Sequence, residues 1–186
     1  AGQNFGNLFL AALSDISGSF EEAVRLTEKV LAITGRVIPV TLESVNLEAE
    51  FDNGKRVTGE IQIVECSKTT GMKIKDIRLS PSNPCPTPDA IEAISKADAI
   101  ILGPGSLYTS IIPNLLVKDI PGAIKKSKAT VIYICNIMTQ PGETIGFGAY
   151  EHIMELENYL GKGAIDTVIV NSKEIPQEWL KLYLED

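Results

Sequence analysis

The second half of the chain alternates between helix-like and strand-like segments, and this alternation constrains the fold more than any other feature of the sequence. Short connections between such segments favour a parallel sheet, whose right-handed crossovers place helices on both faces. The sequence therefore predicts an α/β fold. The predicted strands are residues 99–102, 131–135 and 167–170, and the predicted helices are residues 89–96, a segment from 106 onward, 122–126, 148–160 and 177–184.

The first half adds two helices and an antiparallel hairpin. Apolar residues are dense over 7–16, and Ser19 with Glu22 forms a capping-box pattern that predicts a second helix over 20–33. The turn Asp52-Asn53-Gly54 suits the positive φ angles of a tight hairpin, so we expect a hairpin insert at about 45–64. The predicted strands of this half are residues 36–40, 46–51, 57–64 and 74–79, and the proline-rich stretch 80–88 is predicted to be a boundary loop.

Length and charge narrow the functional classes. A chain of 186 residues with 44% hydrophobic content can bury one substantial core, so residues 1–186 are predicted to form a single α/β domain. The 17 basic and 24 acidic residues give a net charge of -7, which argues against a nucleic-acid surface. An anionic ligand would therefore have to be held locally, by backbone N–H groups, hydroxyls and amides.

The remaining composition points to a soluble, unexported protein in a reducing compartment. The three cysteines are widely spaced and favour neither a disulfide framework nor a zinc site. No membrane span and no signal peptide is evident. The chain opens on a helix-like segment without an initiating Met, so we expect it to be a portion of a longer chain that lacks a Gly-rich strand-helix unit.

Two loops that follow predicted strands form the candidate site. The apolar strand 99–102 leads into Gly103-Pro104-Gly105-Ser106, with Ser110 at the end of the same loop, and strand 131–135 leads into a loop that contains Asn136 and Thr139. Ligands of open α/β folds bind outside the carboxyl ends of the strands. The sequence therefore predicts a phosphate-bearing small molecule in a crevice built from 103–110 and 136–144. A plain tight turn is the alternative reading of Gly-Pro-Gly taken alone.

Catalytic readings of the sequence are weak. The glycine-rich loop is not the G-x-S-x-G nucleophile elbow, and the single histidine, His152, falls inside a predicted helix. Cys135 has no second histidine to activate it, and a loop carboxylate such as Glu143 is usually solvated. Metal-ligand spacing is absent, so the sequence predicts no metal site of its own, and Mg²⁺ would need phosphate oxygens or upstream carboxylates.

Three segments together resemble the bacterial gluconeogenesis factor family, within the 2-phospho-L-lactate transferase-like superfamily. They are GNLFLAAL at 6–13, LGPGSLYTSIIPNLL at 102–116 and CNIMTQPGET at 135–144. The resemblance covers essentially the whole chain, but the family's glycine-rich opening and further C-terminal sequence are not present.

The resemblance implies a Rossmann-like three-layer fold with a mostly parallel sheet, a cytoplasmic location, a homodimer, and nucleotide-sugar (UDP-sugar) binding linked to cell shape during gluconeogenic growth. By position, the family's phosphate-binding loop corresponds to Gly103, Gly105, Ser106 and Ser110. Its second pocket segment corresponds to Asn136 and Thr139, and its first to Gly6 and Asn7. From spacing alone, Asn7 is read instead as a helix cap.

Three functions are carried forward. The leading hypothesis is a regulator that binds a UDP-sugar or an NAD-like nucleotide without turnover and needs no further cofactor. The rival is a transferase that moves a phospholactyl-like group from a nucleotide-activated donor to an acceptor alcohol. A structural domain that only binds a protein partner is the third.

Overall fold

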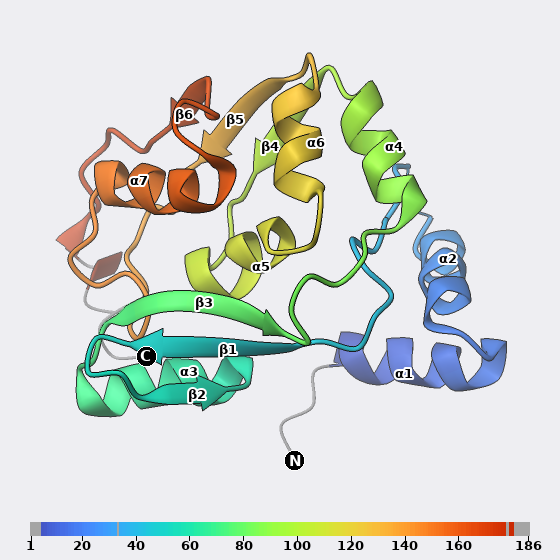
Figure 1. Ribbon diagram of the computed structural model, residues 1–186, viewed down its shortest axis with the longest axis horizontal. Coiled ribbons are helices and arrows are strands. Elements are labelled where there is room, and N and C mark those ends of the chain that lie inside the picture. The colour runs from blue at the N-terminus through green and yellow to red at the C-terminus, as the bar shows by residue number, and fades with distance from the viewer. Residues whose placement is uncertain (1–4, 33, 178, 181–186) are drawn as a thin grey trace.

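The computed structural model describes residues 5–32, 34–177 and 179–180, and it contains two three-stranded sheets (Figure 1). The strand order is β2-β1-β3 in the antiparallel sheet and β4-β5-β6 in the parallel sheet, so the predicted mixed α/β class is confirmed. The elements are α1 (Phe5–Ser17), α2 (Phe20–Val30), β1 (Asn46–Phe51), β2 (Arg56–Thr58), α3 (Glu60–Thr70), β3 (Ile74–Ser80), α4 (Pro88–Lys96), β4 (Ala99–Leu102), the π-helical turn η1 (Leu107–Ile111), α5 (Ile112–Leu115), α6 (Ile120–Lys126), β5 (Thr130–Ile134), α7 (Ala149–Leu160) and β6 (Thr167–Ile169).

The hairpin prediction is right about its turn and wrong about its second strand. Strand β1 pairs with β2, with Ala49 opposite Val57, but β2 ends at Thr58. Gly59, at φ 100, turns the chain into α3, where predicted strand residues 60–64 lie. The helix buries Ile63 completely while Ile61 stays 66% exposed. The alternation of apolar and polar residues over 57–63 is therefore strand-like in sequence only. These residues leave the strand after Thr58, and α3 packs Ile63 against the core instead.

The predicted strand over 36–40 is also wrong. The segment pairs with no strand and is held by single hydrogen bonds. Thr87 donates from its hydroxyl to the Pro39 carbonyl over 2.7 Å and from its N–H to the Val40 carbonyl over 2.8 Å. Pro39 has no N–H to give to a ladder, which explains why a segment of β-type composition forms none here.

The parallel sheet forms as predicted, and helices lie on one face of it. Strand β5 lies between β4 and β6, with Ile101 opposite Ile132 and Ile134 opposite Ile169. Helices α6 and α7 lie over one face of this sheet, and α5 lies beyond the end of β4, above β3 (Figure 1). On the other face, Ile101 is 58% exposed, so the described elements do not supply the predicted second helical layer.

One hydrophobic core joins the two sheets. It includes Phe51 and Ile77 of the antiparallel sheet together with Tyr133 of the parallel sheet and Leu156 of α7. Tyr159 of α7 also accepts a hydrogen bond over 3.4 Å from the Ile77 N–H of strand β3. Helix α7 is therefore one link between the two sheets, and α5, which packs against both β3 and α7, is another.

Two of the predicted helices include residues outside the described ranges. One half of the predicted capping box is confirmed, because the Ser19 hydroxyl accepts from the Glu22 N–H over 3.1 Å and α2 begins at Phe20; the return bond from the Ser19 N–H to Glu22 is not among the hydrogen bonds of the described residues. The predicted end of that helix at residue 33 lies outside the described residues, and the helix ends at Val30. Most of the predicted helix 177–184 lies outside them too. Across the described ranges, no helix is both long and apolar enough to span a bilayer.

Candidate functional site

The first loop leaves β4 at Leu102 and turns sharply at Gly103. This glycine has φ 81, and a Cβ atom there would lie 3.0 Å from the Ile134 carbonyl oxygen and 3.1 Å from Cδ1 of Ile111. Only glycine combines this backbone conformation with so close an approach to the end of β5. The glycine at 103 therefore presses the loop against the carboxyl edge of the parallel sheet.

The loop then forms a π-helical turn rather than an ordinary helix start. The N–H groups of Ser110 and Ile111 both donate to the Ser106 carbonyl over 3.0 Å. Leu107, Tyr108 and Ile111 are buried, so these apolar residues pack the turn against the core. Ser110 remains exposed on the outer side.

Three polar side chains of the second loop hold the first loop in place. Asn136 donates to the Gly105 carbonyl over 2.9 Å and accepts from the Gly105 N–H over 3.3 Å. Gln140 donates to the Ser106 hydroxyl over 2.7 Å. Glu143 accepts from the Tyr108 N–H over 2.9 Å and from the Thr109 hydroxyl over 2.7 Å. We call Asn136, Gln140 and Glu143 the clamp.

The clamp was only partly visible in the sequence. Asn136 was a predicted site residue, whereas Gln140 was missed and Glu143 was expected to be solvated. The signal available in the sequence was the spacing of the three polar residues, which lie four and then three residues apart directly after a predicted strand. Thr139, the other predicted residue of this loop, is half-buried between the clamp residues.

A hollow lies on the outer side of the first loop, at the carboxyl end of β4. Its volume is about 340 Å³, and it is lined by Ile101, Leu102, Gly103, Pro104, Gly105, Ser110, Ile111, Asn114 and Leu115. Among the described residues, the Ser110 hydroxyl has no hydrogen-bond partner. Ser106 accepts from Gln140, which leaves its own O–H to donate elsewhere. We call this cavity the loop hollow.

The structure brings together six of the eight predicted site residues. Gly103, Gly105 and Ser110 line the loop hollow, and Ser106, Asn136 and Thr139 lie on the same two loops. Gly6 and Asn7 do not join them. They lie exposed within α1 rather than before it, and α1 packs against α2, apart from α5 and η1 (Figure 1).

His152 is a structural residue of the core beneath the loops. Its side chain is 2% exposed, and Nδ1 lies 2.9 Å from the Gly148 carbonyl, so Nδ1 carries the proton. The ring stacks on Tyr133 at 6.4 Å and meets Phe147 edge-on at 5.5 Å. These contacts agree with the sequence-based argument against a Ser-His-Asp triad. Burial, with Cys135 nearby, raises the pKa of Tyr133 and keeps its hydroxyl protonated.

A partly buried carboxylate joins the first loop to α7. Burial raises the pKa of Glu155, and the negative charge of Asp76 adds to the effect. Hydrogen bonds from Tyr108 and Asn158 act in the opposite direction. Burial and Glu155 itself raise the pKa values of Tyr108 and Tyr159. The fold therefore favours the protonated form of Glu155 relative to the unfolded chain.

Replacing Glu155 by Gln should make stability less dependent on pH. A pKa raised on folding contributes stability that is present below the unfolded value and is lost as pH rises through the folded value. Relative to the parent, Glu155→Gln should be more stable at pH 7, and this advantage should shrink as pH falls toward the ordinary value of 4.5. Urea unfolding of both proteins at several pH values measures the difference. An advantage that grows on acidification would contradict the assignment.

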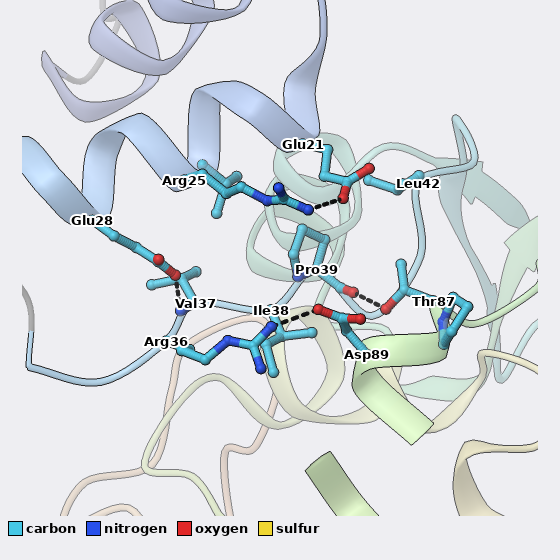
Figure 2. A pocket seen from close by; sticks show the side chains of 12 residues that line it. Glu21, Arg25, Glu28, Arg36, Val37, Ile38, Pro39, Leu42, Thr87 and Asp89 are labelled. Atoms are coloured by element: carbon cyan, nitrogen blue, oxygen red, sulfur yellow. Dashed lines mark hydrogen bonds and ion pairs between the residues drawn. The ribbon is translucent and has the colours of Figure 1, made fainter. Parts of the chain in front are cut away.

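A second cavity, about 210 Å³ in volume, lies between α2, the segment 36–42 and the start of α4. Figure 2 shows that its charged side chains are paired with one another: Arg25 with Glu21, and Arg36 with Asp89. Glu28 accepts from the Val37 N–H. The polar groups of this cavity hold the unpaired segment 36–42 against two helices, which is a structural role.

Within the described parts of the chain, no three His, Cys, Asp or Glu side chains gather as metal ligands.

Comparison with known proteins assigns the chain to a family. A protein of Thermoanaerobacterium thermosulfurigenes, provisionally named a gluconeogenesis factor, is 52% identical over 185 residues, which are 100% of this chain and 57% of that protein. The gluconeogenesis factor of Bacillus subtilis (strain 168) is 47% identical over 182 residues, which are 98% of this chain and 56% of that protein. The crystal structure of protein BH3568 from Bacillus halodurans matches with a TM-score of 0.91 at 41% identity and covers 100% of this chain and 58% of the other.

The chain thus spans little more than half the length of these relatives. The sequence model of one family, described as 2-phospho-L-lactate transferase CofD, matches residues 1–186, which is the whole chain. The predicted resemblance is confirmed: the chain belongs to the CofD family and is similar throughout to its gluconeogenesis factors.

Proposed function

We propose that this protein is a regulator that binds a nucleotide-sugar of the UDP-sugar type, with a phosphate of the ligand in the loop hollow. The observation that carries the proposal is the unpartnered Ser110 hydroxyl beside the backbone of Gly103 and Gly105, at the carboxyl end of a parallel strand. This edge is where open α/β folds bind ligands. Gly103 holds the loop against this edge, and the Ser110 hydroxyl is free to donate to a phosphate oxygen.

The clamp supports the proposal because it preorganises the loop. Gly105 and Ser106 are each held by a side chain of the second loop, so the hydroxyl of Ser106 and the backbone of Gly105 need no reordering when a ligand arrives. Preorganisation of this kind lowers the entropic cost of binding. The lining of the hollow has no Lys or Arg, so hydroxyl and N–H donors of this chain would neutralise phosphate charge only partly.

The physiological part of the proposal starts from the name of one relative and from what the resemblance of the sequence to the gluconeogenesis factor family implies. The Bacillus subtilis relative is named gluconeogenesis factor, and this chain spans 56% of its length. We place the protein's role in the cytoplasm, as a homodimer that supports cell shape during growth on gluconeogenic carbon sources. The nucleotide is its only required ligand in this proposal, and the CofD relatives' further sequence would complete the site.

Transferase activity is the second candidate. It is favoured by the description of the family whose model matches the whole chain, 2-phospho-L-lactate transferase. In that case Ser106 and Ser110 would stabilise the transferring phosphate, and any Mg²⁺ would be held by phosphate oxygens and carboxylates from outside this chain. Release of a nucleoside phosphate on addition of an acceptor alcohol would separate turnover from binding alone.

Calorimetric titration of the full chain with UDP, UDP-N-acetylglucosamine and NAD tests the proposal. We expect saturable binding of the uridine nucleotides, weakened at least about tenfold by Ser110→Tyr because the phenol fills the loop hollow. Ser82→Tyr, at an exposed position of the boundary loop, is the matched control and should bind like the parent. Absence of uridine-nucleotide binding, or equal binding by both variants, would contradict the proposal.

A further inference from the structure

A third hollow lies behind the clamp, where the end of α3 meets the second loop. Its volume is about 330 Å³, and two segments far apart in the sequence line it, residues 67–74 and residues 141–147. The Ser67 hydroxyl donates to the Met72 carbonyl over 2.7 Å and so fixes the connection from α3 to β3. Gly142 is buried against α3 on the opposite wall. We call this cavity the α3 hollow.

The chemistry of the α3 hollow is that of a site for an anion with an apolar body. Met72, Ile74, Ile145 and Phe147 provide apolar walls, and Lys68 and Lys73 provide two exposed ammonium groups. Neither lysine forms an ion pair within the described ranges. The carboxylate of Glu143, which also lines the hollow, is hydrogen-bonded to the first loop instead.

Two contacts connect this hollow to the first loop. Glu143 follows Gly142 directly and holds the Tyr108 N–H and the Thr109 hydroxyl. The Phe147 ring meets the Tyr108 ring edge-on at a centroid distance of 6.5 Å. Glu143 and Phe147 therefore help to position η1, whose next residues, Ser110 and Ile111, line the loop hollow. A ligand that contacts Glu143 or Phe147 contacts groups that hold η1 in place.

We infer that the α3 hollow is a second binding site, for a small organic anion with an apolar or aromatic body, and that its occupancy changes ligand affinity at the first loop. The volume lies at the lower end of the range for small-molecule pockets, which suits a ligand of metabolite size. The second part of this inference rests on the proposed nucleotide binding, whereas the first part does not. Coupling between two sites is reciprocal, so it is measurable from either one.

The three methionines of the chain make the first part testable by NMR of ¹³C-labelled methyl groups. Met72 lines the α3 hollow, Met138 lies in the second loop, and Met154 lies on α7 at 41% exposure. Phenyl phosphate is the probe, with inorganic phosphate and benzyl alcohol as probes that lack one of its two features. On the full chain we expect phenyl phosphate to shift the Met72 signal saturably, at concentrations at which Met154 does not move.

Reversal of the two charges supplies the control variant. Lys68→Glu with Lys73→Glu should weaken phenyl phosphate at least about tenfold while leaving the Met138 and Met154 signals of the unliganded protein unchanged, since both lysine side chains are exposed. The inference is overturned if Met72 never shifts, if it shifts equally in the double variant, or if benzyl alcohol binds as tightly as phenyl phosphate. A shift of Met138 alone would place the probe at the start of the second loop, outside the α3 hollow, and would also overturn it.

Coupling is then measured as the change in affinity for UDP-N-acetylglucosamine when phenyl phosphate saturates the α3 hollow. We expect at least about a threefold change, lost in Glu143→Gln although Met72 still reports phenyl phosphate binding. An unchanged affinity for UDP-N-acetylglucosamine would contradict the coupling between the two sites but not phenyl phosphate binding in the α3 hollow. Failure of UDP-N-acetylglucosamine to bind at all would contradict the proposed function and, with it, the coupling, but not the site that Met72 reports.

Discussion

Gly142→Ala should lower the free energy of unfolding by about 2–5 kcal/mol. Two costs combine. Gly142 has φ 87, which an L-residue with a side chain adopts only with strain, and a Cβ atom there would lie 2.8 Å from the Val64 carbonyl oxygen and 3.1 Å from Cγ of Lys68. A backbone oxygen in a helix cannot move away as a side chain can. The loop or α3 must therefore shift, and Glu143, the next residue, shifts with it.

Gly146→Ala separates these two costs within the same loop. Gly146 has φ 83 and nothing within 4 Å of its Cβ position, so the substitution adds the backbone strain without the steric clash. Urea unfolding should show the smaller loss, about 1–2 kcal/mol, for Gly146→Ala. Uridine-nucleotide affinity should fall only in Gly142→Ala, through displacement of the clamp. Equal losses in the two variants would mean that the contact between Gly142 and Val64 contributes nothing.

Leu156→Ala should cost about 2–5 kcal/mol, because it leaves a cavity in the core that the two sheets share. Leu156 is fully buried on α7, in the same cluster as Phe51, Ile77 and Tyr133. Since α7 also contacts the edge of β3 through Tyr159, the cavity loosens the junction between the sheets as well as the helix. Chemical denaturation followed by circular dichroism measures the loss.

Met154→Ala is the matched control on the same helix. Met154 lies two residues away and is 41% exposed, so its truncation removes a flexible side chain from a partly solvated site. Its cost should stay below about 1 kcal/mol, since exposed substitutions away from special features change stability little and Ala favours the helix. Similar costs for the two variants would show that Leu156 contributes no more to the core than a partly exposed residue of α7.

Local chemistry explains the predictions that succeeded. Ser19 and Glu22 mark the start of α2 because a hydroxyl three residues before a free N–H can cap it whatever the rest of the chain does. Asp52 to Gly54 form the predicted turn, with Gly54 at φ 82. The apolar run Ala99–Leu102 becomes a strand paired in parallel with β5, as continuous apolar runs with short helical crossovers favour.

The failed predictions share a physical cause. Residues 36–40 have the composition of a strand but no partner strand, and residues 60–64 alternate like a strand yet belong to α3. Pairing and burial depend on what lies opposite in space. Neither pairing nor burial is encoded in the order of five consecutive residues, so strand-like composition misled the prediction at 36–40 and apolar alternation misled it at 60–64.

At the candidate site, too, part of the structure could be predicted from the sequence and part could not. That residues 103–110 and 136–144 meet follows from sequence, because the carboxyl ends of neighbouring parallel strands share one edge of a sheet. That Gln140 and Glu143 hold Ser106, Tyr108 and Thr109 does not follow, because those hydrogen bonds join particular side chains to hydroxyl and backbone groups 34 or 35 residues away. Their formation depends on the π-helical turn and on Gly142 packing against α3.

The sequence by itself determined the class of fold, the cap of α2, the hairpin turn, the parallel strands and the sheet edge at which the two loops meet, because short-range sterics, hydrogen bonding and hydrophobic period control each of them. Tertiary structure decided which side of the glycine loop is open, which polar groups the clamp occupies, where α3 replaces a strand, and that Gly6 and Asn7 lie with α2 rather than with the loops. Those outcomes depend on close packing between segments remote in the chain. At Gly142, for example, the Val64 carbonyl oxygen lies 2.8 Å from the position that a Cβ atom would take, so the observed packing of the second loop on α3 requires glycine.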